Sequence, residues 1–381
     1  MPTCLDLSAV AHERAGLARY AASLAQALLA LGVPLTAFVN DSRESHLQPP
    51  LSDLPTLTAN LPRKPWRLRA ALSYFGGPPM DSAFPNVTLF HAAAHLLPKL
   101  TQARSVFTLH DVAYRLYPQY HLLQNRLYLT LMMPRFLARA DAVICVSEHT
   151  RRDALRYYPR LDPAKIHVIP EGVEPHFRPP AHLAELAPIR AKYGLPERFI
   201  LYVGTIEPRK NLPTLLEAYA VLRQHLPEVG LVIVGGKGWL YESFFQALKR
   251  LGLEQHVKLT GYVPEADLPK IIACARVFAY PSEFEGFGLP PLEAMACGVP
   301  VACSNASSLP EVVGDAGLLL PPHDGHAWQS ALYNLLTDVE LRSDLRERGL
   351  ARARQFTWEE TARRTLEVYQ RVEQASGKAK S

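Results

Sequence analysis

Short apolar runs alternate with stretches of helical periodicity along the chain. Residues 17–32, LARYAASLAQALLALG, place apolar side chains at helical spacing and end at a glycine. Buried strands are predicted for the runs PLTAFVN (34–40), VTLFHA (87–92), SVFTLHD (105–111), AVICVSE (142–148) and KIHVIPEG (165–172). Strands that alternate with helices in this way predict a parallel sheet covered by crossover helices.

A second series of the same kind follows a polar, proline-rich connector near 174–198. Its strands are predicted within RFILYVGTIEPRKN (198–211), LVIVGGKGW (231–239), HVKLTGYVP (256–264), RVFAYPSEFEGFG (276–288) and GVPVACSN (298–305). The tail, 358–374, is predicted to form an amphipathic helix. The fold class is therefore α/β, with one Rossmann-like domain over 1–178 and another over 190–357. Ligands of such sheets lie beyond the carboxyl ends of the strands, so the cleft between the two domains is the expected site.

The composition is that of a globular protein of two domains. The 381 residues are 48% apolar and 20% charged, which excludes a disordered or fibrous chain. No uncharged apolar stretch reaches about 18 residues, so no membrane-spanning helix is predicted. The five cysteines lack C-x-x-C spacing, and we expect buried, reduced thiols in a cytoplasmic protein.

Positive charge is concentrated in the first half. Residues 1–178 hold 19 Lys and Arg against 13 Asp and Glu, whereas the remainder carries a balance of −1. This excess is too small for a dedicated nucleic-acid binder but suits an anionic ligand or lipid. Residues 63–69 and 120–139 mix cations with Trp, Leu, Met and Tyr. They are interpreted as a patch for the inner membrane surface; the alternative for 120–139 is an ordinary helix with one buried face.

The segment YPSEFEGFGLPPLE (280–293) carries the most specific chemistry. Two prolines suit the first turn of a helix, and the N–H groups of Phe287, Gly288 and Leu289 would then point out of the helix start toward a phosphate. Glu285 precedes this helix and Glu293 lies within it. Because carboxylates repel phosphate, they are expected to accept hydrogen bonds from sugar and ribose hydroxyls.

A second loop, GTIEPRKN (204–211), places Arg209 and Lys210 between a strand and a helix. Together they could neutralise a diphosphate leaving group. Gly16 at a helix start would let a ligand approach the backbone closely, and His110 ends a strand where it could hydrogen-bond a sugar hydroxyl.

Several motifs are absent. The sequence holds neither G-x-G-x-x-G nor G-x-x-x-x-G-K-[ST], which disfavours NAD and P-loop chemistry. It also lacks a D-x-D pair for a catalytic divalent ion, and Glu283-Phe-Glu285 is only a weak substitute. We therefore expect no metal and no resident cofactor, so protein cations and N–H groups would have to stabilise a leaving diphosphate.

The chain resembles family 4 of the retaining glycosyltransferases, which have the two-domain GT-B fold. The resemblance rests on GLARY (16–20), HD (110–111), AVICVSEHTRRD (142–153), VIPEGVE (168–174), GTIEPRKN and EGFGLPPLEAMACGVPV (285–301). The last segment carries the family's Glu-x7-Glu pattern. Within the family, the chain is similar to bacterial O-antigen and exopolysaccharide mannosyltransferases. The resemblance also implies that helix 358–374 crosses back to the N-terminal domain.

The resemblance implies roles for individual residues and a nucleotide-diphospho-sugar as the donor substrate. His110, Arg209, Lys210 and Glu285 would be catalytic, and a hexose, most simply mannose from GDP-mannose, would pass to a saccharide or lipid-linked acceptor. Donor-binding residues would be Gly16, Thr205, Arg209, Lys210, Gly261, Tyr262, Val263, Glu285, Phe287, Gly288, Leu289 and Glu293.

Three positions depart from the family pattern. Ala18 replaces the usual second glycine of the first loop, Glu171 stands where many members have Asn, and Glu174 stands where many have Asp.

Three alternatives remain open. One is a glucosyltransferase that uses UDP- or ADP-glucose. Another is a sugar-nucleotide epimerase, against which the Arg-Lys and Glu-x7-Glu pairs speak. The third is a non-catalytic sugar-nucleotide-binding subunit, and transfer to a defined acceptor would distinguish it.

Overall fold

The computed structural model describes residues 3–12, 15–41 and 47–377, and these form two compact units. Unit 1 comprises 1–172 together with 357–381, and unit 2 comprises 173–356. The first boundary lies a few residues before the predicted 178. The reason is local packing: Val173 N donates to Phe356 O at 3.1 Å and Phe177 is buried, so the start of the connector belongs to unit 2.

In the described part of unit 1, seven parallel strands follow the order β3-β2-β1-β4-β5-β6-β7. The strands are β1 (Thr3–Asp6), β2 (Leu35–Val39), β3 (Thr56–Thr58), β4 (Leu89–Ala92), β5 (Arg104–Leu109), β6 (Ala142–Cys145) and β7 (Ile166–Val168). The helices are α1 (Ser8–Ala11), α2 (Ala15–Ala30), α3 (Arg63–Tyr74), α4 (Ala113–Leu116), α5 (Leu123–Arg139), α6 (Glu148–Tyr157) and α15 (Trp358–Gly377).

In unit 2, six parallel strands follow the order β10-β9-β8-β11-β12-β13. They are β8 (Arg198–Val203), β9 (Val229–Val234), β10 (Val257–Gly261), β11 (Val277–Tyr280), β12 (Val301–Ser304) and β13 (Gly317–Leu320). The helices are α7 (Ala187–Tyr193), α8 (Leu212–His225), α9 (Glu242–Arg250), α10 (Leu268–Cys274), α11 (Leu289–Ala296), α12 (Leu309–Val313), α13 (Gly325–Thr337) and α14 (Val339–Ala353). Both units are doubly wound α/β sheets, as predicted.

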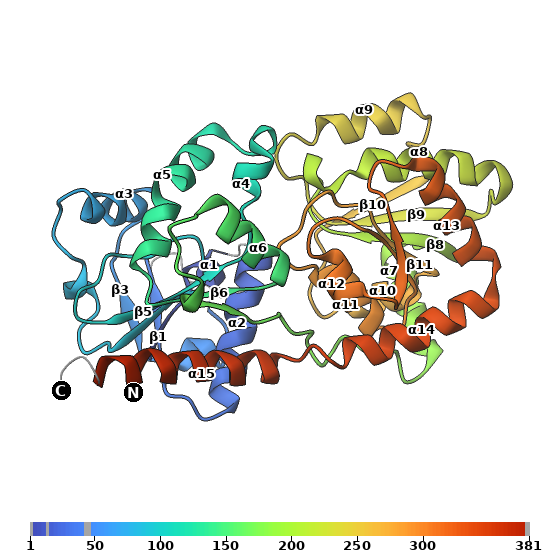
Figure 1. The fold of residues 1–381 in the computed structure, drawn as a ribbon. Helices are drawn as coiled ribbons and strands as arrows, with labels where there is room; N and C mark the ends of the chain where they lie inside the picture. The colour runs from blue at the N-terminus through green and yellow to red at the C-terminus, as the bar shows by residue number, and fades with distance from the viewer. Residues whose placement is uncertain (1–2, 13–14, 42–46, 378–381) are drawn as a thin grey trace. The chain divides into compact units, whose positions relative to one another are not determined.

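The C-terminal helix α15 packs in unit 1, beside α2 and against β5 and β6 (Figure 1). A buried hydrogen-bonded chain joins it to the sheet. His91 in β4 contacts Tyr369 of α15 through Nδ1 at 2.6 Å and Thr108 of β5 through Nε2 at 2.7 Å, and Thr108 contacts the Tyr20 hydroxyl at 3.1 Å. Burial and the charge of His110 lower the pKa of His91 to about 3, so its ring is neutral. His91 therefore serves the packing of α15.

In β4 and β5, the residues next to His91 and Thr108 face the opposite side of the sheet, because side chains alternate along a strand. Phe90 and Phe107 belong to an aromatic core that also takes Trp66 from α3 and Phe136 from α5.

No helix among the described residues is both long and apolar enough to cross a membrane. The five cysteines are free and buried.

Candidate functional site

Two adjacent strands mark the point in unit 2 where the strand order changes direction. β8 and β11 are neighbours in the sheet, although two strands separate them in the chain. Loops that follow such a pair diverge and leave room for a ligand at the carboxyl edge. The loop after β8 carries Arg209 and Lys210, and the loop after β11 carries Glu285. The sequence thus brings three of its predicted catalytic residues to one edge.

Two glycines allow the loop after β8 to leave the sheet tightly. Gly204 and Gly235 have φ values of 153° and 143°, and a Cβ on Gly235 would lie 2.1 Å from the Gly204 carbonyl oxygen. The loop then forms a 3₁₀ turn over Pro208–Lys210. Asn211 follows in the left-handed region with φ of 52° and donates to Pro322 O at 2.6 Å. These contacts fix the turn that presents both cations.

Arg209, Lys210 and Glu285 are bonded to one another. Arg209 donates through Nη1 to Glu285 Oε2 at 3.0 Å and through Nη2 to Glu207 Oε1 at 2.7 Å. Lys210 Nζ donates to Glu285 Oε1 at 2.6 Å and to the Tyr280 hydroxyl at 2.9 Å, which in turn donates to Glu285 Oε1 at 3.0 Å. We call these five residues the ion cluster. It balances two cations against two carboxylates.

Serine side chains hold the backbone that carries the cluster. Glu285 N donates to Ser307 Oγ at 2.8 Å, and Ser308 Oγ donates to the carbonyl oxygens of Glu285 at 2.9 Å and of Phe287 at 2.6 Å. From the loop that carries Glu285, Ser282 Oγ donates to Arg209 O in the loop after β8 at 3.2 Å. The two loops therefore support each other, and the charged side chains start from fixed backbone.

Four residues of the ion cluster are buried and Arg209 is partly buried, so the charges interact strongly. Burial alone would raise the pKa of the Glu285 carboxyl, but Lys210 and Arg209 outweigh it and bring that pKa down to about 2. Burial lowers the pKa of Lys210, and the Glu285 charge opposes this change. Since Glu285 is ionised at neutral pH, its oxygens are engaged as acceptors by the cations. From the sequence, the two cations were predicted to contact a diphosphate and Glu285 to contact sugar hydroxyls. In the structure, Arg209 and Lys210 also both bind Glu285.

Helix α11 begins in the loop after β11, where the sequence predicts a phosphate site. The helix starts at Leu289 and has prolines in its first turn, as the sequence predicts. Gly288 precedes it with φ of 130°, and a Cβ there would lie 2.8 Å from Leu309 Cδ2, so glycine is required. Glu293 is 2% exposed on α11, where burial and its charge both raise the pKa of Cys297.

The remaining predicted donor residues of unit 2 lie at the same carboxyl edge. Thr205 follows β8, and its carbonyl oxygen accepts from the Tyr202 hydroxyl at 3.4 Å. Gly261 ends β10 with φ of 72° and accepts from Gly235 N at 3.0 Å. Tyr262 is 85% exposed, whereas Val263 is buried. Tyr262 is therefore the member of this loop whose ring is open to a ligand.

In unit 1, His110 follows β5 and is 8% exposed. Its Nε2 lies 2.9 Å from the Ala93 carbonyl oxygen, and its Nδ1 lies 3.6 Å from Glu171 Oε1. Both ring nitrogens thus face acceptors within the protein. The predicted hydrogen bond from His110 to a sugar hydroxyl would have to compete with them.

Gly16 is exposed near the start of α2, and a Cβ added there would meet no atom within 4 Å. Packing among the described residues does not demand a glycine at this position. Tyr20, one turn further along α2, packs the edge of its ring against His110 with ring centroids 4.7 Å apart. The GLARY segment therefore supports the predicted site histidine.

Glu283 and Glu285 do not form a pair. Glu283 lies 3.6 Å from His323, whereas Glu285 is held by the cations. Within the described ranges, no group of three or more His, Cys, Asp or Glu side chains is arranged to hold a metal ion.

Sequence reasoning missed several residues of the site. Glu207 and Tyr280 complete the ion cluster, and their positions beside Arg209 and at the end of an apolar strand were the available signals. Ser307 and Ser308 gave no local signal, because they come from the loop after β12. Glu171 was noted only as a departure from the family pattern.

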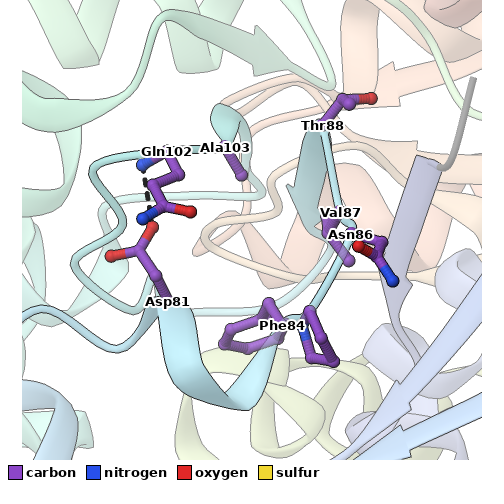
Figure 2. Close-up of a pocket in the computed structure, with 8 residues that line it drawn as sticks. Asp81, Phe84, Asn86, Val87, Thr88, Gln102 and Ala103 are labelled. Carbon is purple, nitrogen blue, oxygen red and sulfur yellow. Dashed lines mark hydrogen bonds between the residues drawn. The ribbon is translucent and has the colours of Figure 1, made fainter.

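A hollow of about 450 Å³ lies elsewhere in unit 1 (Figure 2). Its lining residues immediately precede β4 and β5, so it opens at the amino ends of these strands. The Asp81 carboxylate accepts from the backbone of Gln102 at 2.8 Å and of Thr101 at 2.9 Å. None of the predicted site residues lines this hollow.

Both halves of the chain match known families. Residues 14–177 match the glycosyltransferase family 4 domain, and residues 187–352 match the glycosyl transferases group 1 domain. The chain belongs to glycosyltransferase family 4. The O-antigen chain mannosyltransferase B of Escherichia coli is 39% identical over 290 residues, which cover 74% of each chain.

A second relative is much longer. The serotype-specific mannosyltransferase WbdA of Escherichia coli is 33% identical over 244 residues, which cover 62% of this chain and 30% of WbdA.

Solved structures share the fold over almost the full length. Sucrose-phosphate synthase of Thermosynechococcus elongatus is 25% identical with a TM-score of 0.77, covering 98% of this chain and 100% of its own. Anabaena HepE, in complex with UDP and glucose, is 19% identical with a TM-score of 0.73, covering 97% and 99%. The family 4 glycosyltransferase described here therefore has the GT-B type of fold.

Proposed function

We propose that this glycosyltransferase moves mannose from GDP-mannose to a saccharide or lipid-linked saccharide acceptor in cell-surface polysaccharide synthesis. The observation that carries the proposal is the buried ion cluster at the switch point of unit 2, which holds Arg209 and Lys210 beside the start of α11. The names of the Escherichia coli mannosyltransferases support the donor sugar and the acceptor class.

The ion cluster suits the departure of a diphosphate. Its two cations are already held in place, so no reorganisation is needed when negative charge develops on the leaving oxygen. N–H groups at the start of α11 add positive partial charge. In this proposal, Glu285 orients the cations and accepts from donor sugar hydroxyls, Glu293 holds the ribose, and Tyr262 lies near the base.

The reaction is proposed to retain the anomeric configuration. The bond from C1 of the sugar to the β-phosphate oxygen breaks, and its electron pair stays with the phosphate. The acceptor hydroxyl attacks C1 from the same face and loses its proton to a β-phosphate oxygen. Gly16 and His110 are proposed to meet the diphosphate and the sugar. Since the protein supplies the cations, the proposal needs no metal ion and no protein nucleophile.

Transfer in the presence of EDTA tests this function. We expect mannose to pass from GDP-mannose to a saccharide or lipid-linked acceptor, and NMR of the product to show the anomeric configuration of the donor. Inverted product or activity abolished by EDTA would contradict the mechanism. Transfer from UDP-glucose or ADP-glucose instead would support the alternative glucosyltransferase. These donors are included because the structure of HepE contains UDP and glucose.

We propose that the patch predicted to contact a membrane is the exposed surface of helices α3 and α5 in unit 1. Helices α3 and α5 of unit 1 are adjacent, because Arg67 donates to Asn125 at 2.9 Å and stacks 3.9 Å from the Tyr128 ring. Both helices expose large apolar side chains: Leu68, Leu72, Leu123, Leu127 and Leu131, with Phe75 just beyond α3. Neither α3 nor α5 contains an acidic residue, and together they hold seven Lys and Arg.

Exposed leucines among cations favour an anionic bilayer as the occupant of this surface. The alternative interpretation of 120–139 as an ordinary helix with one buried face agrees with the burial of Met132, Met133, Phe136 and Leu137 in α5, and the proposed membrane contact concerns the opposite, exposed face.

Vesicle flotation tests the contact. We expect binding to phosphatidylglycerol vesicles at low salt, and roughly tenfold weaker binding for the L68S/L127S double variant. The control is L183S, which removes a leucine that is 81% exposed on unit 2. Equal binding by all three proteins, or binding to phosphatidylcholine alone, would contradict the proposed surface. Self-association that the double variant abolishes would point to a second copy instead.

A further inference from the structure

Glu171 is a buried carboxylate that the proposed mechanism does not use. It is 6% exposed and lies in the loop after β7, at the carboxyl edge of the unit 1 sheet. Its Oε1 lies 3.6 Å from Nδ1 of His110. A buried carboxylate needs a polar or charged partner, and here that partner is the histidine predicted to meet the donor sugar. We propose that Glu171 is a positioning residue for His110 in sugar transfer.

The His110 ring is held from three sides. The Ala93 carbonyl can only accept, so Nε2 is the nitrogen that donates to it at 2.9 Å. Glu171 faces the opposite nitrogen, Nδ1, at 3.6 Å and pairs with it when that nitrogen also carries a proton. Tyr20 packs its edge against the ring with centroids 4.7 Å apart. A flip would turn ring carbon atoms toward the Ala93 carbonyl and Glu171, so these contacts favour one orientation of the ring.

Glu171 can fix another group because its own loop is clamped by the start of α15. Thr361 Oγ1 donates to Pro170 O at 2.8 Å, and a Cβ on Gly172 would lie 2.2 Å from Trp358 N. Glycine at 172 is therefore needed for the loop to lie against the helix backbone. These contacts with α15 therefore fix the position of Glu171 relative to His110.

The same helix supports the opposite side of the histidine. Trp358 packs on Tyr20 with ring centroids 5.8 Å apart. Further along α15, the chain from Tyr369 through His91 and Thr108 fixes the Tyr20 hydroxyl. Burial first, and then the charge of Glu171, raise the pKa of Tyr20, as expected for groups that lie close together. Glu171, Tyr20 and His110 thus form one buried assembly anchored on α15.

This positioning role rests on the proposed function for its kinetic readout. We expect E171A to lower kcat roughly 10- to 100-fold, because a loosened ring departs from its reactive geometry. KM for the donor should change less than threefold. E171D should recover part of kcat, since it restores a carboxylate, and the nearly isosteric E171Q should fall between E171A and the native enzyme.

The control is E174Q, which changes a neighbouring glutamate that is also a departure from the family pattern. It should leave kcat unchanged. If E171A turns over as fast as E174Q, or if its lower activity merely follows a smaller folded fraction in thermal unfolding, the proposal is wrong.

A second readout does not depend on transfer. NMR of ¹⁵N-histidine-labelled protein, assigned by a histidine variant, reports the ring nitrogens of His110. We expect these signals to shift and broaden in E171A and E171Q but not in E174Q. Unchanged ring signals would overturn the positioning role. If the native enzyme transfers no sugar but the His110 ring signals change in E171A, the proposed function is wrong. The contact between Glu171 and His110 would still be supported.

Discussion

The carboxyl edges of the two units share a topology but carry different chemistry. In unit 2, the edge holds the buried Lys210 and the partly buried Arg209, balanced by Glu207 and Glu285. In unit 1, the edge holds His110 between Ala93 and Glu171, with the neutral His91 chain behind it. The same kind of sheet edge therefore carries cations in unit 2 and a histidine in unit 1.

The difference also separates two ways of holding a functional group. Unit 2 fixes its cations by direct ion pairs, whose burial is tolerable only because each charge has a partner. Unit 1 fixes His110 through hydrogen bonds and ring packing that trace back to α15. Charge changes should therefore damage unit 2 more than unit 1.

The largest effect is expected from E285Q. Removal of this charge leaves the buried Lys210 without its carboxylate partner, while Arg209 keeps Glu207, and the free energy of unfolding should fall by about 3–5 kcal/mol. Urea unfolding measures the loss. The control E217Q breaks the exposed pair with Arg250 and should cost about 0–1 kcal/mol. Equal stability of the two variants would mean that the ion cluster contributes no more than a surface pair.

K210A should have the next largest effect, on catalysis. Loss of one leaving-group cation should cost about 2–4 kcal/mol of transition-state stabilisation, measured from kcat/KM. K192A removes an exposed lysine that pairs with Asp267 at 2.7 Å in the same unit and is the matched control. Near-native turnover by K210A would remove Lys210 from the leaving-group role.

Acid should weaken unit 2 through Glu285. Its folded pKa of about 2 lies below the ordinary value of 4.5, so the ionised carboxylate stabilises the fold fully above about pH 4.5. That contribution is lost as the pH falls through 2. The free energy of unfolding, measured from pH 6 downward, should decline more steeply in the native protein than in E285Q. Parallel curves would show that Glu285 does not titrate with unfolding.

The smallest effect separates ligand approach from packing. G16A should raise the free energy of unfolding by up to about 1 kcal/mol, because alanine favours the helix and the added Cβ meets open space. Activity should nevertheless fall if a diphosphate approaches this backbone. G325A makes the same change at the start of α13, where a Cβ also meets nothing, and should leave activity intact. Equal activity of both variants would argue against Gly16 as a ligand contact.

Strands with strong apolar patterns were predictable, and weak ones were not. All five predicted strands of each unit are present. The prediction omitted β1, whose four residues include Thr3 and Asp6, the short polar β3, and β13 over Gly317–Leu320. Helices α3, α13 and α14 were not identified either. Their residues gain stability from partners distant in sequence, such as Phe38 for Trp66 of α3.

The candidate site was predictable in its residue types but not in its pairing. Arg209, Lys210 and Glu285 stood out because they follow strands of an α/β unit. Their bonds to one another depend on β8 and β11 being neighbours, which the chain order hides. Glu171 acquires meaning only when the loop after β7 is seen beside His110.

One measurement tests most directly the claim that the ion cluster receives the donor diphosphate. Thermal unfolding of native protein, K210A and K192A should be followed with GDP, UDP and ADP. A nucleotide at about 100 times its dissociation constant adds about 2.7 kcal/mol, enough to raise Tm by a few degrees. We expect this shift in the native protein and in K192A for at least one nucleotide, and its loss in K210A. An equal shift in K210A, or none in the native protein, would contradict it.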